Sequence, residues 1–193
     1  MQYIQKLLFV SIFLFAIVAC NKEEEKNQDS DPQLTTQVYY QEIDDVILRE
    51  DITKRIEIDL NDDREIDIAF ELINLNDYDQ AQHLTDSLAA RVITPNVAVL
   101  DNSTWGYADA LDKDFLLTAS MQWGTRENFV LGTNPAGEFN GKGIKYLGFR
   151  MKNGNSFYYG WVKLECSQDR DVLHIISCGI SEQANHLIQT GQK

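Results

Sequence analysis

The chain has 193 residues, of which 30 are acidic and 17 are lysine or arginine, so its formal net charge at pH 7 is −13. A charge this negative excludes nucleic acid and anionic lipid headgroups as partners, because both are bound through a basic surface. The length allows one domain with a core large enough to fold without disulfides or metals as staples.

Residues 1–19 have the pattern of an export signal. Lys6 supplies a positive charge before Leu7–Val18, which is apolar apart from Ser11. Twelve residues form a helix of about 18 Å, too short to cross a bilayer core of about 30 Å. This length is typical of a signal peptide.

The apolar run ends at Ile17-Val18-Ala19-Cys20, which resembles the lipobox of bacterial lipoproteins. The resemblance implies cleavage after Ala19 and a lipid on Cys20, which anchors the mature chain to a membrane. A thiolate is a natural nucleophile for this chemistry, and two or three acyl chains anchor more firmly than one. The alternative is an ordinary secretory signal followed by an incidental cysteine.

Residues 20–35 are predicted to form an acylated, disordered and charged tether. Asn21 in place of aspartate resembles lipoproteins that move on to the outer membrane of the cell envelope. The run Cys20-Asn21-Lys22-Glu23 resembles a surface-export tag of bacteroidete-type lipoproteins, and we favour the cell surface over the periplasmic face. The alternative is a solvated charge run without further meaning. Removing residues 1–19 takes away one lysine and no acid, so the mature chain has a formal charge of −14.

Strand patterns dominate residues 36–193, the predicted single domain. Polar and apolar residues alternate in 55–60 and in 67–72, as in half-buried strands. Short apolar runs at 97–100 and 115–117 indicate buried strands. Many short strands with turns between them predict a mainly β fold, an antiparallel β-sandwich with little helix.

One segment, 78–92, has apolar residues at helical spacing and predicts either a short helix or an irregular excursion. Within it, Asp86-Ser87-Leu88 resembles the tripeptide at which bacteroidete-type exported proteins are O-glycosylated, with Ser87 as the modified residue. So short a match also arises by chance.

An acidic loop joins the first two of these strands and places oxygen ligands at alternate positions: Asp59, Asn61, Asp63, the carbonyl of Glu65, and Asp67. The spacing resembles the calcium loops of EF-hand and dockerin-type repeats, which implies a Ca²⁺ site. Arg64 stands where such loops have a glycine, and Phe70 stands where they have a bidentate glutamate, so the expected site is weak. The alternative is an acidic turn without a metal.

The clearest predicted element is a hairpin over residues 144–165. Asn153-Gly154 is a strong hairpin signal, and with these two residues as the loop, Phe149 pairs with Tyr158. The two faces carry, respectively, Leu147, Phe149, Met151, Tyr158, Val162 and Leu164, and Tyr146, Arg150, Phe157, Tyr159, Trp161 and Lys163. Because both faces are rich in apolar surface, either the hairpin lies centrally with something on both sides, or the aromatic face is an exposed platform.

As an exposed platform, Tyr146, Tyr159 and Trp161 beside Arg150 would form a ligand-binding face on which sugar rings could stack. The alternative is that these aromatic rings belong to the core, where strand aromatics usually pack.

Segments of this hairpin, Tyr146–Arg150 and Tyr158–Leu164, resemble a group of secreted, poorly characterised bacterial β-domains that also have an acidic loop upstream. The resemblance spans about residues 55–191 and implies a secreted β-rich domain without an established activity. Cys166 and Cys178 would lie about 20 Å apart in a simple hairpin, beyond disulfide reach, so we predict two buried thiols.

The sequence contains no Gly-x-Ser-x-Gly, no His-Glu-x-x-His and no phosphate-binding glycine loop. It therefore favours a non-enzymatic, lipid-anchored envelope module that binds or adheres to a glycan or to an envelope protein. The first alternative is an envelope polysaccharide hydrolase, which needs only two carboxylates in a cleft. The second is a purely structural envelope component.

Overall fold

The computed structural model describes residues 36–49, 55–74, 88–101, 106–132 and 137–193. They belong to one compact unit, Leu34–Lys193, which is separate from the unit Met1–Gln33. The predicted signal segment, Cys20, the tether and Ser87 lie outside the described residues. Among the described residues, no helix has the length and hydropathy needed to cross a membrane.

The described residues form strands and turns without a helix. The strands are β1 (Val38–Arg49), β2 (Arg55–Ile58), β3 (Ile68–Asn74), β4 (Leu88–Ile93), β5 (Val97–Leu100), β6 (Ala110–Leu111), β7 (Leu116–Leu117), β8 (Trp123–Gly124), β9 (Asn128–Gly132), β10 (Ile144–Asn153), β11 (Ser156–Cys166), β12 (Val172–Ser181) and β13 (Ile188–Gln189).

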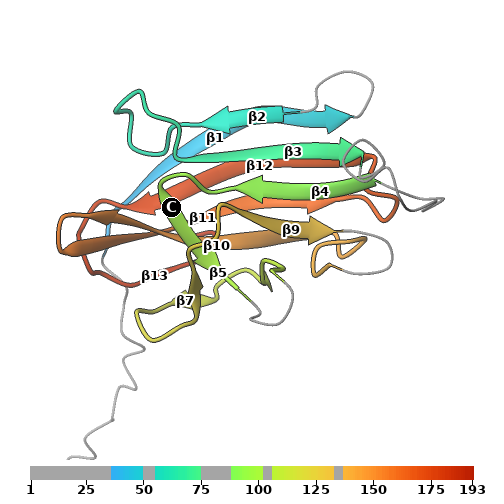
Figure 1. Ribbon diagram of the computed structural model, residues 1–193. Coiled ribbons are helices and arrows are strands. Elements are labelled where there is room, and N and C mark those ends of the chain that lie inside the picture. The colour runs from blue at the N-terminus through green and yellow to red at the C-terminus, as the bar shows by residue number, and fades with distance from the viewer. Residues whose placement is uncertain (1–35, 50–54, 75–87, 102–105, 133–136) are drawn as a thin grey trace, which may run out of the picture. The chain divides into compact units, whose positions relative to one another are not determined.

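These strands form antiparallel sheets packed against each other (Figure 1). The largest sheet has the order β1-β12-β11-β10-β5-β8, with β6 also paired to β10. A four-stranded sheet has the order β2-β3-β4-β9, and β13 pairs with β7 in a short ribbon. The mainly β, antiparallel sandwich-like fold predicted from the sequence is confirmed.

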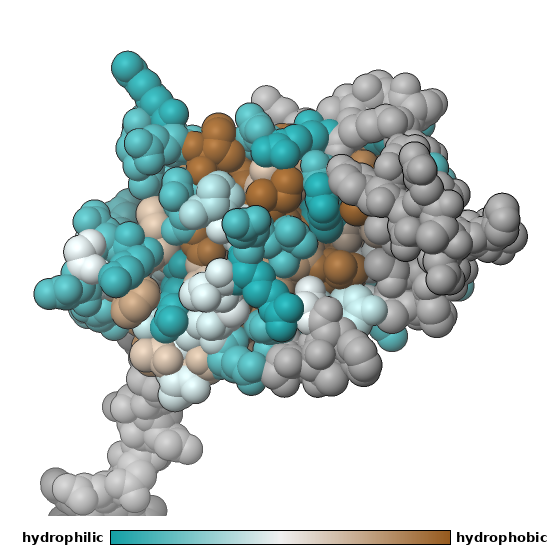
Figure 2. Space-filling view, in the orientation of Figure 1, coloured by the Kyte–Doolittle hydropathy of each residue, from teal (hydrophilic) through white to brown (hydrophobic). Residues whose placement is uncertain are grey.

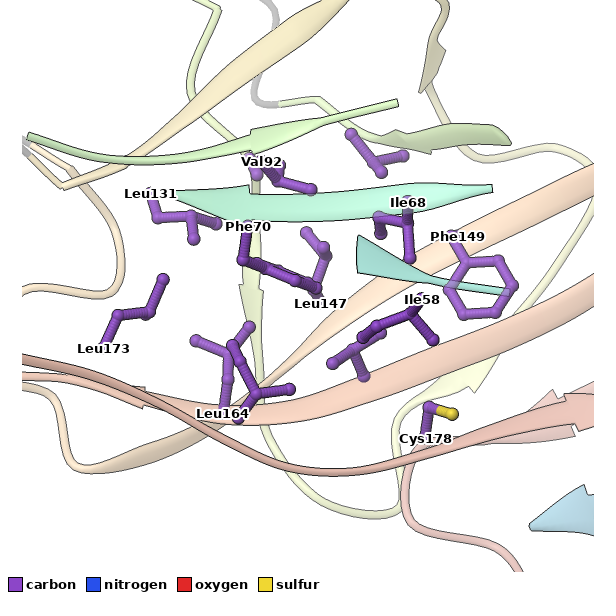
Figure 3. Close-up of a cluster of buried hydrophobic side chains, with 14 of the residues drawn as sticks. Ile58, Ile68, Phe70, Val92, Leu131, Leu147, Phe149, Leu164, Leu173 and Cys178 are labelled. Carbon is purple, nitrogen blue, oxygen red and sulfur yellow. The ribbon is translucent and has the colours of Figure 1, made fainter. Parts of the chain in front are cut away.

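The main core lies between the four-stranded sheet and the largest sheet (Figure 3). Phe70 and Val92 enter it from the smaller sheet, and Leu147, Leu164 and Leu173 enter it from the larger one. Burying each such side chain contributes about 1.5–3 kcal/mol of transfer free energy. On the outer face drawn in Figure 2, most residues are hydrophilic, and hydrophobic ones lie among them in small groups.

The predicted hairpin exists as β10 and β11, but its predicted register was wrong by two residues. The loop is Gly154-Asn155, and Phe149 pairs with Gly160 instead of Tyr158. Gly154 occupies the first central position of the turn and has a φ of 60°, as a type II′ turn requires. Side chains alternate with a period of two, so a shift of two residues leaves each one on its predicted face.

The hairpin is covered on both faces, which decides between the two arrangements that the sequence left open. A second cluster of buried residues lies on the face opposite the main core: Leu100, Leu111, Leu117, Tyr146, Tyr159, Trp161 and Ile188. Leu117 belongs to β7 and Ile188 to β13, so the ribbon near the C-terminus closes this face. The hairpin is therefore a central element of the fold.

Two local predictions were wrong. Of the segment 78–92, predicted as a short helix or an irregular excursion, residues 78–87 lie outside the described residues. Residues 88–93 form β4, because Ala90 and Val92 are buried between β3 and β9 and this packing overrides helix propensity. In the run 115–117, only Leu117 is buried, since Phe115 and Leu116 remain 40% and 36% exposed.

The two cysteines of the domain are buried free thiols, as predicted. Cys166 pairs across the strands with Leu173, five residues before Cys178 in sequence. Burial raises the pKa of each thiol to about 12.

Candidate functional sites

The acidic loop of residues 59–67 joins β2 to β3, where Ile58 pairs with Ile68. Asp67 forms two hydrogen bonds that close the base of the loop. Its backbone N–H donates to the carbonyl of Ile58 at 3.1 Å, and its Oδ2 accepts the N–H of Leu60 at 2.9 Å. Leu60 is buried, so the loop is attached to the core on one side.

The carboxylate of Asp59 organises the tip of this loop. It accepts the backbone N–H of Arg64 at 2.6 Å, that of Asn61 at 3.2 Å and that of Asp63 at 3.3 Å. Partial burial opposes ionisation of Asp59, but these backbone hydrogen bonds outweigh it and lower its pKa. Asp59 is therefore ionised, and the backbone of residues 61–64 turns around its carboxylate.

The next two predicted ligands bond to each other. Nδ2 of Asn61 donates to Oδ2 of Asp63 at 2.9 Å, and the N–H of Asp63 donates to Oδ1 of Asn61 at 3.0 Å. Oδ1 of Asp63 also accepts the N–H of Glu65 at 2.8 Å. These contacts hold residues 59–65 in a tight coil of chain.

The backbone of this coil is left-handed at two residues, Asp62 with a φ of 60° and Arg64 with a φ of 72°. Aspartate tolerates this conformation, whereas arginine adopts it rarely. Arg64 holds the sixth position of the predicted calcium loop, where glycine makes the sharp turn in EF-hands. The chain thus makes the turn of such a loop without the glycine, at a cost of about 1–2 kcal/mol.

Asp67 is buried, and its pKa shifts in the opposite direction to that of Asp59. Burial raises its pKa, and the negative charges of Asp63 and Asp59 raise it further. Hydrogen bonds from the Leu60 N–H and the Asn96 side chain oppose this shift. A cation near these three carboxylates would relieve the repulsion and favour the ionised form of Asp67.

The chemistry of the loop fits a hard cation in part. Its carboxylate, amide and carbonyl oxygens are the ligands that Ca²⁺ prefers, but five protein oxygens fall short of the usual six to eight. In the described part of the chain, no three His, Cys, Asp or Glu side chains converge as a metal-binding group. Asn61, Asp63, Glu65 and Asp67 do line a common cavity of about 290 Å³.

The three aromatic residues of the predicted platform are buried. Tyr146 is 6% exposed, Tyr159 is 2% exposed and Trp161 is 1% exposed. The Trp161 ring meets Tyr146 edge-on at a centroid distance of 5.5 Å and Tyr40 at 6.0 Å. In this structure these rings form the second core and offer no face on which a sugar could stack.

The fourth residue of the predicted platform, Arg150, lies at the rim of this second core and lines an open pocket of about 520 Å³. We call it the Arg150 pocket. Its described lining residues are Thr94, Pro95, Asn96, Val97, Ala98, Thr125, Arg150, Lys152 and Phe157. Five of them lie on the paired strands β5, β10 and β11, namely Val97, Ala98, Arg150, Lys152 and Phe157. Thr94, Pro95 and Asn96 lie in the turn between β4 and β5, and Thr125 follows β8.

The guanidinium of Arg150 lies against two aromatic rings. Its Cζ lies 4.3 Å from the centroid of the Phe157 ring and 5.3 Å from that of Trp123. Trp123 itself packs against Tyr159 at 5.8 Å and donates its indole N–H to the carbonyl of Thr118. Each cation–π contact of this kind contributes about 0.5–2 kcal/mol.

Arg150 has no ion-pair partner among the described residues, and its buried Nε has no hydrogen-bond acceptor there. Burial lowers the pKa of Arg150, while Tyr159 works in the opposite direction. Arginine stays protonated in proteins. The pocket therefore contains a positive charge that the described structure leaves without a counter-charge.

Sequence analysis placed Phe157 on the same face as Arg150 but missed Lys152. Lys152 was within reach, because residues two apart on a strand share a face. The contact of Trp123 with Arg150 depends on the pairing of β5 with β8, which no local pattern indicates.

Comparison with family models, with curated proteins and with solved structures found no match to the chain. Inferences about function therefore rest on the residues themselves.

Proposed function

We propose that this protein is a lipid-anchored domain of the bacterial cell envelope that binds a ligand and does not catalyse a reaction. The lipobox-like Ile17–Cys20 supports attachment to the outer membrane through a lipid on Cys20. The charge of the chain supports a partner other than nucleic acid. The ligand is a glycan or another envelope protein.

One observation supports the binding function: the Arg150 pocket is open and presents a cation that has no ion-pair partner among the described residues. Leaving a buried polar group without a partner costs about 1–3 kcal/mol. Such a cost is expected where a ligand supplies the missing partner. Ligand pockets typically combine apolar walls with a few polar groups, as this pocket does with Val97, Phe157 and Arg150.

The proposed ligand-contact surface is the Arg150 pocket instead of the aromatic platform. Tyr159 of the second core pairs with Arg150 across β10 and β11 and packs against Trp123. Phe157 and Trp123 are only partly buried and lie at the rim, where a sugar ring or an aromatic group could contact them.

We also propose that Ca²⁺ bound weakly to the acidic loop stiffens the domain. Support comes from Asp59, Asn61, Asp63, the Glu65 carbonyl and Asp67, whose spacing and oxygen chemistry suit the ion. The left-handed turn at Arg64 is a second support. A weak site suits a protein exposed to millimolar calcium outside the cell.

Blocking the pocket tests the binding function. The mature chain from residue 20, with Cys20→Ser to keep it soluble, is immobilised and exposed to envelope polysaccharide and to solubilised envelope proteins. Thr125→Trp fills the mouth of the pocket from an exposed position, and Ala119→Trp adds the same bulk at an exposed position outside the lining residues.

We expect one fraction to be retained by the unmodified chain and by Ala119→Trp, and to be lost with Thr125→Trp. Equal retention by both tryptophan variants would place binding away from the pocket. If the unmodified chain retains neither envelope polysaccharide nor envelope protein, the binding function is contradicted and a structural envelope component is favoured.

A further inference from the structure

We propose that the Arg150 pocket holds an oxyanion, a carboxylate, sulfate or phosphate group of its ligand, between Arg150 and Lys152. This inference rests on the proposed binding function and names the chemistry of the ligand. Binding is reversible and involves no covalent step.

The placement of the two cations is the first support. Arg150 and Lys152 are two residues apart on β10, so their side chains leave the same face of the sheet about 7 Å apart. Both line the same pocket, opposite Ala98 of β5 and Phe157 of β11. An anionic group of two or three oxygens can span this separation and contact both side chains.

The restraint on Arg150 is the second support. Contacts with the Phe157 and Trp123 rings restrain the guanidinium of Arg150. A planar fork of N–H donors matches carboxylate and phosphate oxygens in a bidentate manner. Because the side chain is already ordered, binding loses less conformational entropy than it would with a free arginine.

The absence of competing acids is the third support. The chain has nearly two acidic residues for each basic one, yet none of the described residues that line the Arg150 pocket is acidic. Lys152 also borders the cavity beside Asp63 and Glu65, but it forms no ion pair with a described residue. The carboxylates of the described residues therefore leave both cations available.

The remaining wall indicates what carries the oxyanion. Pro95, Val97 and Phe157 are apolar, while Thr94, Asn96 and Thr125 are polar without charge. A volume of about 520 Å³ lies within the range of small-molecule pockets. A single acidic sugar residue or a comparable small acid fits this combination of one charged end and one ring face.

The test compares D-glucuronate with D-glucose, which share a ring and differ by one carboxylate. Inorganic sulfate and phosphate serve as bare oxyanions. Binding to the mature chain with Cys20→Ser is followed by NMR, using the Nε–H signal of Arg150 and the indole N–H signal of Trp123. Lys152→Gln removes one cation of the pocket from an exposed position. Lys142→Gln removes the same charge from an exposed turn elsewhere.

We expect glucuronate, and sulfate or phosphate as well, to shift both signals at millimolar concentration, with glucose causing no shift. Lys152→Gln should weaken binding about threefold, the effect of an exposed ion pair. Arg150→Lys keeps the charge but removes the fork, and should weaken binding about tenfold. Lys142→Gln should have no effect, and added salt should weaken binding.

Equal shifts with glucose and glucuronate, no shift with any of the anions, or equal effects of Lys142→Gln and Lys152→Gln would overturn the inference. Its failure is distinguishable from failure of the proposed function. If an envelope fraction is lost with Thr125→Trp while the anions cause no shift, the binding function stands and the oxyanion fails. If glucuronate binds but no envelope fraction does, the oxyanion site stands and the proposed binding of an envelope component fails.

Discussion

The ring of Phe149 lies against the α-carbon of Gly160, its partner across β10 and β11, and fills the space that a side chain at Gly160 would need. A β-carbon at Gly160 would overlap the ring. An aromatic side chain over a strand glycine covers exposed backbone and fixes the pairing of the two strands. This contact therefore holds the register of the central hairpin.

Gly160→Ala is expected to lower the free energy of unfolding by about 1–3 kcal/mol, because the added methyl overpacks the core against Phe149. Urea unfolding at 25 °C measures the change. The double variant with Phe149→Leu should recover part of the loss relative to the sum of the single changes, since the smaller side chain makes room.

Gly143→Ala is the control for Gly160→Ala. A β-carbon there meets no atom within 4 Å, but the φ of 70° is unfavourable for alanine. The expected cost is about 1 kcal/mol from the backbone alone. If the two glycine variants cost the same, and Phe149→Leu changes nothing, then Phe149 does not occupy this space.

Calcium is expected to raise the melting temperature of the domain. With the ion at about ten times the dissociation constant of a weak site, the stabilisation is about 1.4 kcal/mol, or roughly 3–6 °C for a domain of this size. Thermal unfolding in 5 mM CaCl₂ and in excess chelator measures it. Asp63→Asn should abolish most of the shift, and Arg64→Gly should increase it by relieving the strained turn. An unchanged melting temperature across millimolar calcium would reduce residues 59–67 to an acidic turn.

Asp67→Asn is expected to raise the melting temperature at pH 7 in chelator by about 2–4 °C. The asparagine oxygen can still accept the N–H of Leu60, and the repulsion with Asp59 and Asp63 is gone. The sign follows from the raised pKa of Asp67. The folded state binds this proton more tightly than the unfolded state does, so the contribution of Asp67 to stability is fully present below about pH 3.9 and is lost as the pH rises through the folded pKa.

The gain from Asp67→Asn should therefore shrink as the pH is lowered toward 4. The control is Asp62→Asn, which changes an exposed carboxylate in the same loop. A destabilising effect of Asp67→Asn at pH 7 in chelator would mean that the ionised carboxylate is already satisfied without a cation.

Cys166 and Cys178 are expected to resist alkylation and disulfide reagents in the folded domain at pH 8. Burial raises the pKa of both thiols to about 12, so neither forms the reactive thiolate. Titration with a chromogenic disulfide should detect no thiol in the folded Cys20→Ser chain and two in denaturant, with one remaining after Cys178→Ala. A thiol that reacts in the folded state would contradict the burial. Stability from keeping both thiols protonated is fully present below about pH 8.5 and is lost as the pH rises toward 12.

The sequence predicted correctly those elements that local patterns determine. Alternation located β2 and β3 with the acidic loop between them, and a turn signal located the central hairpin. The faces of that hairpin were correct even though its register was not, because a slip of two residues preserves the alternation. The sequence could not choose between Asn153-Gly154 and Gly154-Asn155, since both pairs suit a tight turn.

Features that depend on distant segments were beyond the sequence. Burial of Tyr159 and Trp161 requires the ribbon of β7 and β13, whose two strands are only two residues long and lie about 70 residues apart. Likewise, Leu88–Ile93 has the propensity of a helix and becomes a strand because β3 and β9 flank it. The contact of Trp123 with Arg150 follows from the same kind of long-range pairing.

The lipid on Cys20 is the claim on which the envelope function depends most, and metabolic labelling tests it directly. Cells that express the full chain are fed an alkyne-tagged palmitate, and the label is detected after membrane fractionation. We predict that the unmodified chain is labelled and is found in the outer-membrane fraction, and that Cys20→Ala is unlabelled and leaves that fraction. Label that persists in Cys20→Ala, or an unlabelled chain that is released in soluble form, would contradict the account.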